Sequence, residues 1–448
     1  MPLLFKFYKN IGDILKTQGG DNMNFSRWET TENMEKLVPL IKVNKDSEIN
    51  KSGFPVAYDE ENLFITNRLN HNLVIGSTGS GKTQTVTLPI LELSSRAGES
   101  VVAHDTTSEI YNMTKENFIN RGYNVIKLNF DDARECNYWN PFDLPHKLYK
   151  DGNKDKAQDL IEEIGYYLLT DIDDFKTDQF WVNSTINYFT GLVLCAFQEN
   201  EEVNINTIIE LDNRIRENKN EIINTLNKNS TAYLNLRGTL EAPPETKGSI
   251  LAVFSQKIKR YVSRENLKNV LSKTDFDISK IAQEKTIVYI TSGNSNNSEH
   301  LLPLLISQIY YAKDEYSKQI GKINVIVDDF YELYPIKRFT KMLNYANSIN
   351  ISFTIMIRGF NDLNNSYGKE QTEIIKMCFS NIVYLLSQDV DTLEAISKYC
   401  GDTCVDGIVR PLITIEELKT LRPFEAVVLM VRIMPYKTKL LPYFQMKL

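Results

Sequence analysis

The sequence is poor in the residues that hold metal ions and disulfides. Its 448 residues include only 5 cysteines and 4 histidines, a supply that suits a reducing cytoplasm. The one close cysteine pair is Cys400 and Cys404, and no second pair or nearby histidine completes a zinc site. The length is sufficient for two or three domains, each with a hydrophobic core.

Long hydrophobic runs and an excess of positive charge are also missing. No run of eighteen apolar residues occurs and no secretory signal peptide is visible, so we expect no direct membrane span. These absences favour a cytoplasmic protein, including one that is peripheral at the inner face of the membrane. The formal net charge is −7, from 51 basic and 58 acidic residues. Contact with DNA would therefore require a local basic surface, such as the lining of a channel.

The most informative segment that is present is a phosphate-binding loop. Gly76, Gly81, Lys82 and Thr83 match G-x-x-x-x-G-K-[ST] directly after the apolar run Leu73–Ile75. The loop consists of Gly76, Ser77, Thr78, Gly79, Ser80, Gly81, Lys82 and Thr83. Backbone N–H groups of such a loop converge on phosphate oxygens, the lysine reaches the β- and γ-phosphates, and the threonine hydroxyl ligates Mg²⁺. The alternative, a glycine loop that binds nothing, is disfavoured by the strand before it, and we predict a site for ATP and Mg²⁺.

A second element of the same site follows a later apolar strand. Val325–Asp329 ends in two carboxylates, as a Walker B element does. In an open parallel sheet, ligands bind outside the carboxyl ends of the strands, where this segment would end. We expect Asp328 to hold Mg²⁺, directly or through water, and Asp329 to orient and deprotonate the attacking water. Two acidic residues after a strand can also form an ordinary turn, which is the alternative interpretation.

The order of strand and helix patterns predicts the fold class. Short apolar runs at Ser100–His104 and Tyr123–Leu128 continue a strand–helix alternation, which is typical of a parallel sheet with helices on both faces. From about residue 145 to 248 long helical patterns replace it. Strand patterns then return at Thr286–Thr291, Ile323–Val327, Ile351–Ile357 and Asn381–Leu386. We predict a RecA-like P-loop NTPase of the α/β class, with a mainly parallel sheet and an inserted all-helical domain.

This interpretation divides the chain into four parts. They are an N-terminal segment at 1–70, a first part of the nucleotide-binding domain at 71–145, the helical domain at 146–250 and a second nucleotide-binding part at 251–448. A helix is expected over Thr83–Ser95, with a kink at Pro89. One more is expected over Ile205–Leu226, and another over Leu251–Leu271. Its basic side chains are either a DNA contact or a solvated helix face, and they are Lys257, Lys259, Arg260 and Arg264.

Seven short segments, in order along the chain, together resemble the type IV secretion coupling proteins, the hexameric ATPases of bacterial conjugation. The segments are Gly76–Thr83, Asp105–Tyr111, Trp139–Phe142, Asp178–Trp181, Asp275–Asp277, Asp328–Phe330 with Leu333, and Tyr367–Gly368. They are similar to the family's phosphate loop, D-P-K-G-E-L-Y, W-N-P-L, the entry to its helical domain, S-D-F-D, D-E-F-x-x-L and Y-G. No single short match is specific to the family, but seven matches in the family's order are.

The departures from the family pattern concern catalysis. The glutamate of its Walker B element is Asp329 here, one methylene shorter, and its Pro-Lys-Gly is Thr106–Ser108. The arginine that reaches a neighbouring subunit's nucleotide falls on Asn347, and a glutamine at the end of the next strand falls on Arg358. Arg358 either faces the phosphates from that position or pairs with Asp362. The family's membrane-spanning N-terminal helices are not matched.

The resemblance implies an ATP-hydrolysing motor. Such a protein would assemble as a homo-hexamer, recruit DNA or a relaxase-type protein bound to DNA, and move it toward a secretion channel. A membrane-anchored partner protein would take the place of the unmatched helices. Lys82, Asp329 and Arg358 would be its catalytic residues, with Thr83 and Asp328 holding the metal. The alternative is a nucleotide-binding adaptor or scaffold with little or no hydrolysis, which the departures favour.

Overall fold

The computed structural model describes residues 25–37, 40–44, 47–58, 62–66, 70–134, 136–171, 178–218, 226–291 and 297–446. The chain divides into two compact units. Unit 1 contains residues 1–47, 53–90 and 356–448, and unit 2 contains residues 48–52 and 91–355. Of the N-terminal segment expected at 1–70, residues 1–24 lie outside the described residues. Each unit is considered by itself below.

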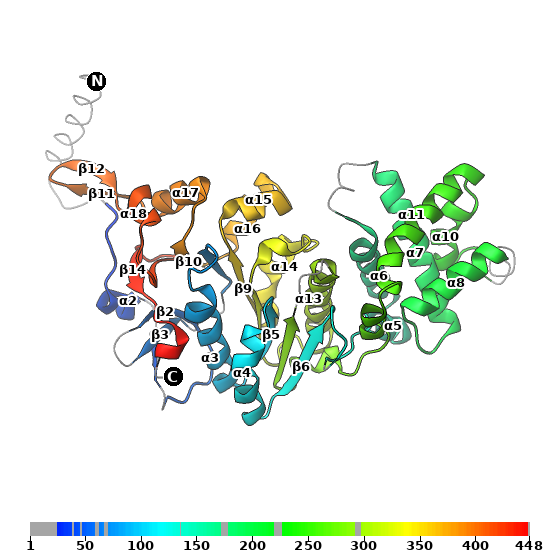
Figure 1. Ribbon diagram of the computed structural model, residues 1–448, viewed down its shortest axis with the longest axis horizontal. Coiled ribbons are helices and arrows are strands. Elements are labelled where there is room, and N and C mark those ends of the chain that lie inside the picture. The colour runs from blue at the N-terminus through cyan, green and yellow to red at the C-terminus, as the bar shows by residue number, and fades with distance from the viewer. Residues whose placement is uncertain are drawn as a thin grey trace, which may run out of the picture. The chain divides into compact units, whose positions relative to one another are not determined.

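Unit 1 contains a small antiparallel sheet and part of the large sheet (Figure 1). The small sheet has the order β1-β3-β2, with β1 (Leu40–Val43), β2 (Phe54–Tyr58) and β3 (Leu63–Thr66). The strands of the large sheet follow the order β14-β13-β10-β4, with β4 (Asn72–Gly76), β10 (Asn381–Leu386), β13 (Glu425–Met430) and β14 (Tyr436–Lys439). β4 and β10 run parallel, whereas β13 is antiparallel to both of its neighbours.

β4 forms where it was predicted because its residues suit a strand that is covered on both faces. All five residues from Asn72 to Gly76 are buried, and Val74 pairs with Val383 of β10. A continuous apolar run, without polar alternation, is what a buried parallel strand requires. The strand therefore delivers the glycine-rich loop to the carboxyl end of a rigid element.

The helix that follows the loop differs from the prediction. Thr83–Thr87 form a π-helical turn, η1, and a regular helix, α3, then runs over Leu88–Ala97. The N–H of Leu88 bonds to the carbonyl of Thr83, five residues back. Pro89 cannot donate a backbone hydrogen bond, and the wider turn before it replaces the expected kink. The expected end at Ser95 was two residues too early, and Gly98 follows the helix with φ +71°.

Unit 2 contains an all-parallel set of strands in the order β9-β8-β5-β7-β6. They are β5 (Ser100–Asp105), β6 (Asn124–Asn129), β7 (Thr286–Thr291), β8 (Ile323–Val327) and β9 (Ile351–Ile357), the last of which spans the division between the units. The predicted bounds of β7, β8, β9 and β10 are confirmed. The α/β class and the mainly parallel sheet are confirmed with them.

The connections of unit 2 are helical, as parallel strands require. The connecting helices are α4 (Glu109–Asn120) from β5 to β6, α13 (Asn297–Tyr316) from β7 to β8, and α14 (Phe339–Ala346) from β8 to β9.

Both units contain further short elements besides the sheets, these connections and an inserted group of helices. They are α2 (Thr31–Leu37), η3 (Ile278–Lys280), η4 (Phe330–Glu332), η5 (Asn347–Ile349), α15 (Phe360–Tyr367), α16 (Lys369–Met377), α17 (Val390–Cys400), β11 (Asp402–Val405), β12 (Ile408–Pro411), α18 (Ile415–Lys419) and η6 (Tyr443–Gln445).

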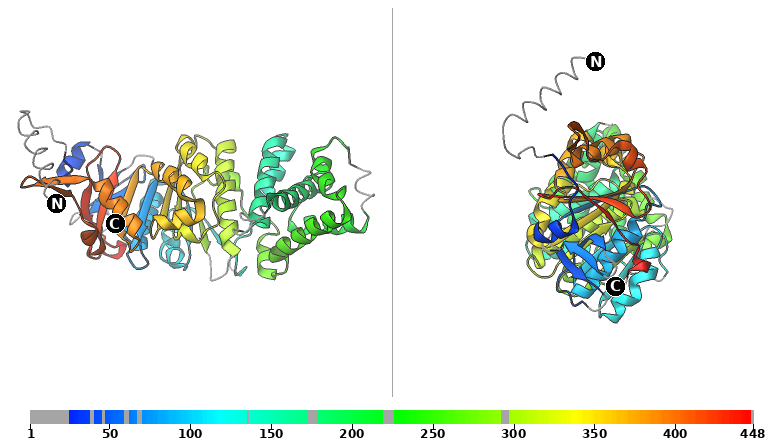
Figure 2. Two further views of the ribbon diagram at one scale, coloured as in Figure 1. Left: turned by 90° about the horizontal axis from the view of Figure 1, so that it is seen from above. Right: turned by 90° about the vertical axis from the view of Figure 1, so that its left-hand side faces the viewer.

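A group of helices is inserted between β6 and β7, and Figures 1 and 2 show it gathered into a bundle beside the strands of unit 2. Its members are α5 (Asp143–Lys150), α6 (Lys154–Leu169), α7 (Gln179–Glu199), α8 (Ile205–Glu217), α10 (Thr231–Leu240), α11 (Pro244–Val262) and α12 (Glu265–Val270). α7 is central, since it packs against α6, α8, α10 and α11. Every residue from Tyr188 to Phe197 is buried, which suits a helix surrounded by others.

Two helix predictions in this region need comment. The expected helix Leu251–Leu271 is wrong as a single element, because α11 begins at Pro244 and a break at Ser263 and Arg264 separates it from α12. Proline at the first helical position explains the early start. The helix expected from Ile205 ends at Glu217, and residues 219–225 of the expected span lie outside the described residues. Among the helices that the structure describes, none combines the length and the hydropathy of a membrane-spanning segment.

Candidate functional site

The phosphate loop of unit 1 is folded around the side chain of Lys82. The Lys82 ammonium is almost buried and donates to the carbonyl oxygens of Gly76 at 2.8 Å and Ser77 at 3.4 Å. A side chain at Gly76 would collide with Ser80 Oγ and would stand 2.9 Å from Lys82 Cγ. Gly79 and Gly81 have φ of +79° and +92°, values that residues with side chains rarely adopt. Each glycine of the motif is thus favoured locally, either because a side chain would collide or because φ is positive.

The loop also has the features that a bound phosphate would need. The hydroxyl oxygen of Ser80 is buried and has no hydrogen-bond partner among the described residues. Space beside Gly79 is open, with no atom within 4 Å of the position that a Cβ would occupy. The ammonium of Lys82 is held by neutral carbonyls, which a phosphate oxygen can replace. The residues present therefore fit a nucleoside triphosphate.

The ends of two neighbouring segments of unit 1 lie beside this loop. The N–H of Ser77 donates to the carbonyl of Leu386 at 2.9 Å, which joins the loop to the end of β10. The hydroxyl of Ser387 donates to the carbonyl of Arg358 at 2.7 Å, which joins that strand end to the residue after β9. Ser77 and Arg358 line a common pocket of about 230 Å³ with Asp389. The sequence predicted this neighbourhood for Arg358 only through the resemblance.

Arg358 makes the local contact that was its alternative interpretation. Its guanidinium Nη2 lies 3.2 Å from Asp362 Oδ1, and its backbone N–H donates to Asp362 Oδ2 at 2.8 Å. The arginine side chain is 47% exposed and the aspartate side chain 13% exposed. A pair this exposed contributes little to stability, about 1 kcal/mol or less, so Arg358 can exchange partners at low cost. The side chain thus combines a surface ion pair with a place in the pocket beside the loop.

The two carboxylates of the Walker B segment lie in unit 2, at the end of β8. Asp328 is buried, and its Oδ1 accepts the N–H of Asp329 at 3.0 Å. Asp329 is partly exposed and has φ +48° and ψ +48°, the left-handed conformation. Aspartate and asparagine tolerate this conformation better than other residues with side chains. A turn of that shape gives a physical reason for a short acid at position 329.

His104 supports this turn, and its place at the end of a strand is the one sign of that role in the sequence. Its Nδ1 lies 2.7 Å from the carbonyl oxygen of Asp328, and since a carbonyl only accepts, Nδ1 carries the proton. Burial lowers the pKa of His104, although the Asp328 carbonyl and the charge of Asp329 act in the opposite direction. The residue is therefore a neutral hydrogen-bond donor that fixes the backbone before Asp329.

The segment Asp105–Tyr111 has a structural role in unit 2. Asp105 is buried, and its Oδ2 accepts the N–H of Tyr111 at 2.8 Å at the start of α4. Burial raises the pKa of the Asp105 carboxyl, and backbone N–H groups partly compensate. Ser108 has φ +61°, at the position where the family pattern has glycine. The serine thus adopts a backbone conformation that glycine favours, at some conformational cost.

The basic residues of α11 are partly neutralised. Lys257 Nζ lies 2.6 Å from Asp171 Oδ2, and Arg260 Nη2 lies 3.0 Å from Asp171 Oδ1. His300, at the start of α13, approaches the same carboxylate at 3.6 Å. Two of the four basic residues singled out in the sequence thus face an acid, which favours a structural role for them over a contact with DNA.

His300 gives a testable pH dependence. Burial lowers its pKa from 6.5 to about 4, so between these values the unfolded chain binds more protons than the folded one. The contribution of His300 to the free energy of unfolding should be complete above about pH 6.5. It should be lost as the pH drops toward 4, by on the order of 3 kcal/mol. We expect the variant His300→Gln to show a smaller loss. Urea unfolding at pH 8 and pH 5 measures it, and equal losses in both proteins would contradict the assignment.

Phe424 is a residue near the loop that sequence reasoning missed. A Cβ at Gly81 would lie 3.2 Å from Phe424 Cε1, so the ring borders the phosphate loop. Phe424 itself has φ +66°, which is unusual for a bulky residue and shows that its surroundings impose the conformation. No local pattern could have indicated it, because the contact joins segments that are far apart in the sequence.

The strand, glycine-rich loop, buried lysine and acidic strand end define the class of the protein. It has the fold of a P-loop NTPase, with a mostly parallel sheet and a separate group of helices. The chain belongs to the family described as type IV secretory system conjugative DNA transfer, whose profile matches residues 20–407. The resemblance seen in the sequence is confirmed. Among curated proteins, none matches the sequence.

Solved structures share this fold. The unbound bacterial conjugative coupling protein TrwBdeltaN70 aligns with a TM-score of 0.62 at 14% identity over 95% of each chain. The plasmid coupling protein TrwB in complex with ADP and Mg²⁺ gives 0.58 at 14% identity, over 95% of this chain and 96% of that one. VirB4 of Thermoanaerobacter pseudethanolicus gives 0.55 at 13% identity, over 89% and 100%. At such identities the likeness concerns the fold.

Proposed function

We propose that the protein is an ATP-hydrolysing coupling protein of a type IV secretion system for conjugation. It would recruit DNA, or DNA with a relaxase-type protein, and move it toward the secretion channel. The observation that carries this proposal is the phosphate loop, in which the almost buried Lys82 is held by two carbonyls that a phosphate can replace. Family membership supplies the context, since the matching profile describes conjugative DNA transfer.

The chemistry of the site is positioning and electrostatics. The loop residues 76–83 surround the phosphates with N–H groups, and Lys82 compensates the charge on the β- and γ-phosphates. Thr83 and Asp328 would hold Mg²⁺, which when bound neutralises charge on the phosphate oxygens. Asp329 orients the attacking water and accepts its proton, and His104 holds the turn in which Asp329 stands. The structures of TrwB with an ATP analogue and with ADP and Mg²⁺ support this choice of ligands.

The assembly and the partners follow from the same family. We infer a homo-hexamer that works at the cytoplasmic face of the membrane, with a membrane-anchored or secretion-channel partner. Nucleotide sites of such rings lie at subunit interfaces, and the family places an arginine of one subunit at the site of the next. Here that position is Asn347, an exposed residue at the start of η5 that carries no charge. Another cation, such as Arg358, would therefore have to compensate charge.

A second candidate function is a nucleotide-binding adaptor that hydrolyses little or nothing. The specific observation in its favour is the ion pair of Arg358 with Asp362, which engages the guanidinium with a carboxylate of its own subunit. The short side chain of Asp329 favours it as well. An ATPase assay with and without single-stranded or double-stranded DNA separates the two. A motor should hydrolyse ATP faster with DNA, whereas an adaptor should bind nucleotide and show no turnover above that of Lys82→Ala.

Arg358 provides a prediction that distinguishes its two roles. If it compensates phosphate charge within its own subunit, Arg358→Ala should lower turnover on the order of a thousandfold with nucleotide binding retained. The variant Asp362→Asn, which loses only the charge of its partner, should keep or raise turnover. Steady-state ATPase rates over a range of protein concentration measure both. Near wild-type turnover in Arg358→Ala and in Arg358→Gln would limit the arginine to its surface ion pair.

The helical region at 146–250 is proposed as the substrate-engaging domain. The proposed boundary at residue 250 falls inside α11. The region also contacts the rest of unit 2, because α6 packs against α13 through Ala157, Leu160 and Ala312. We expect α7, α8 and α10 to unfold as one cooperative unit, separately from the strands of unit 2. Native-state hydrogen exchange measures the opening free energy of each amide. A single shared opening free energy for these helices and for β5 and β8 would contradict a separate domain.

A further inference from the structure

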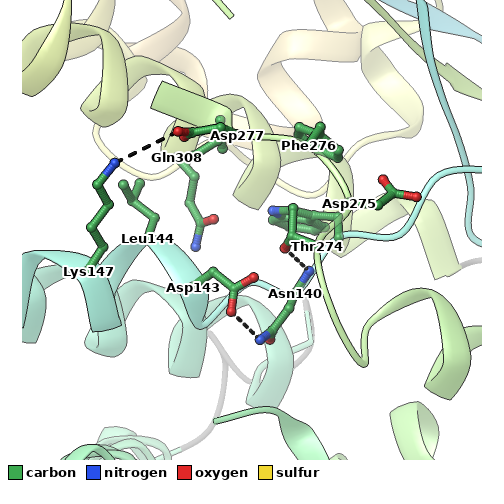
Figure 3. A pocket seen from close by; sticks show the side chains of 11 residues that line it. Asn140, Asp143, Leu144, Lys147, Thr274, Asp275, Phe276, Asp277 and Gln308 are labelled. Atoms are coloured by element: carbon green, nitrogen blue, oxygen red, sulfur yellow. Dashed lines mark hydrogen bonds and ion pairs between the residues drawn. The ribbon is translucent and has the colours of Figure 1, made fainter. Parts of the chain in front are cut away.

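Two of the sequence motifs that the nucleotide site leaves unexplained meet at a pocket in unit 2. The pocket has a volume of about 430 Å³, a size typical of ligand sites. Trp139 and Asn140 come from the first motif, and Asp275, Phe276 and Asp277 come from the second. Figure 3 shows Asn140, Phe276 and Asp277 around one opening, and the carboxylate of Asp275 directed outward from it. The two motifs are therefore parts of one surface feature.

Hydrogen bonds between the segments hold the pocket in shape. The N–H of Asn140 donates to Thr274 Oγ1 at 2.8 Å, and its side-chain amide donates to Asp143 Oδ1 at 2.5 Å. The N–H of Trp139 donates to the carbonyl of Val270 at 2.8 Å. Trp139 and Asn140 are themselves buried. The part of the wall that Trp139 and Asn140 form is therefore held by buried groups.

The charge of the lining is negative. Asp143, Asp275 and Asp277 contribute three carboxylates, against the single ammonium of Lys147. Lys147 Nζ lies 4.0 Å from Asp277 Oδ2, donates to Ser279 Oγ at 3.2 Å and stands over the ring of Tyr316. Its charge is thus paired with Asp277. Asp143 and Asp275 accept hydrogen bonds from the neutral side-chain amides of Asn140 and Asn137, respectively.

The electrostatics around Asp143 agree with this description. Loss of solvation is the largest cause that raises the pKa of the Asp143 carboxyl, and the charge of Glu202 acts in the same direction. The hydrogen bonds from Thr274 and Asn140 lower it only in part. A cation bound beside Asp143 would supply the compensation that the chain does not.

Gln308 gives a second, independent observation. This side chain of α13 is completely buried and lines the pocket, and Figure 3 shows it directed toward the opening. Its Nε2 donates to the carbonyl of Pro141 at 2.7 Å, whereas its Oε1 has no hydrogen-bond partner in the described part of the chain. A buried acceptor without a donor costs about 1–3 kcal/mol, which a donor on a ligand would recover.

These features select the class of ligand. Phosphate groups of DNA are repelled by the excess of two negative charges. A metal ion does not fit, because the described residues contain no group of three or more acidic, histidine or cysteine side chains placed to hold one. Acceptors spread beside the apolar side chains of Leu144, Phe276 and Ile278 instead suit a planar cation with several N–H groups on an apolar stem.

We propose that this pocket binds an arginine side chain of a protein partner. The aliphatic stem would lie along Leu144 and Ile278, and the guanidinium would face Asp143, with one N–H directed to Gln308 Oε1. Asp275, an exposed acid of the lining, would add negative charge at the rim of the pocket. Arginine fits better than lysine because its flat fork donates in several directions and packs on aromatic rings such as Phe276. The motifs would then serve partner recognition, apart from nucleotide hydrolysis.

The test uses the full chain without nucleotide and three small probes. These are N-acetyl-arginine methylamide, the uncharged analogue N-acetyl-citrulline methylamide, and the free diamine putrescine. Ligand-detected NMR titrations should show the arginine probe binding at least tenfold more tightly than the other two. Asp143→Asn should weaken it roughly tenfold or more, because it removes a charged acceptor, and Asp275→Asn should weaken it on the order of threefold, because it removes a nearby negative charge. Asp155→Asn, an exposed acid on α6, loses the same charge outside the pocket and should leave binding unchanged.

Thermal unfolding of each variant separates loss of binding from loss of fold. Asp275 is exposed, so Asp275→Asn keeps the test valid even if Asp143→Asn does not fold. Equal binding of the arginine and citrulline probes would overturn the proposal, as would binding that Asp275→Asn leaves unchanged. Tighter binding of putrescine than of the arginine probe would also overturn it, because the occupant would then be a free diamine.

Discussion

Replacing Asp329 by asparagine is expected to lower ATP turnover on the order of a hundredfold to ten-thousandfold, because the variant cannot accept a proton from the attacking water. Asparagine has the same size and tolerates the left-handed conformation of this residue, with φ +48°. The fold and nucleotide binding should therefore be retained. Phosphate release under saturating ATP and Mg²⁺ measures the loss, and thermal unfolding checks the fold.

Asp329→Glu is the matched variant for this prediction. The longer acid restores the family's reach and should raise turnover, since a misplacement of about 1 Å can cost on the order of a hundredfold in rate. The same change should lower stability by about 1 kcal/mol, because glutamate does not favour the left-handed conformation. Turnover that neither substitution alters would show that another group, such as Glu332, is the base or that the protein is an adaptor.

Lys82→Ala should remove the stabilisation that ATP and Mg²⁺ give to the protein. A ligand at a hundredfold excess over its Kd stabilises the native state by about 2.7 kcal/mol. Alanine cannot compensate phosphate charge, so the melting temperature of the variant should not respond to the nucleotide. Differential scanning fluorimetry over a range of ATP concentration measures this response.

In that experiment the melting temperature of each variant with nucleotide is compared with its own melting temperature without nucleotide. Lys82 also holds the carbonyls of Gly76 and Ser77, so its removal should change the loop even before a ligand is added. Only the gain on addition of nucleotide reports the phosphate contact. Lys369→Ala, an exposed lysine at the start of α16, serves as the control and should keep the full gain. A gain in Lys82→Ala equal to that of the control would place the nucleotide elsewhere.

The parts of the fold that could be predicted are those that single segments encode. β7, β8 and β9 are fully buried runs in which apolar and β-branched residues predominate, so their bounds follow from the pattern alone. The phosphate loop can be recognised because its glycines lie within eight residues and are required by the local backbone conformation. The helical insertion was recognisable from the absence of strand patterns. The placement of each of these elements needed no knowledge of distant contacts.

The features that could not be predicted depend on packing between distant segments. Phe424 borders Gly81 only through the tertiary fold. The pocket at Trp139 and Phe276 joins residues on either side of most of the helical insertion. The partner of Arg358 was one of two possibilities, and only the structure shows the ion pair with Asp362. Helix periodicity also cannot indicate the π-helical turn after the loop, since one added residue leaves most of the pattern unchanged.

That turn, at Thr83–Thr87, has a consequence for how the chain can vary in length. A π-helical turn contains about one residue more than an α-helical turn, so the stretch between loop and helix carries a spare residue. Deleting one residue there would let the turn become regular while Leu88 and Leu91 kept their buried positions. The same deletion inside α3 would rotate every following side chain by about 100°. The turn is thus the place in this helix where the chain can lose a residue without repacking its core.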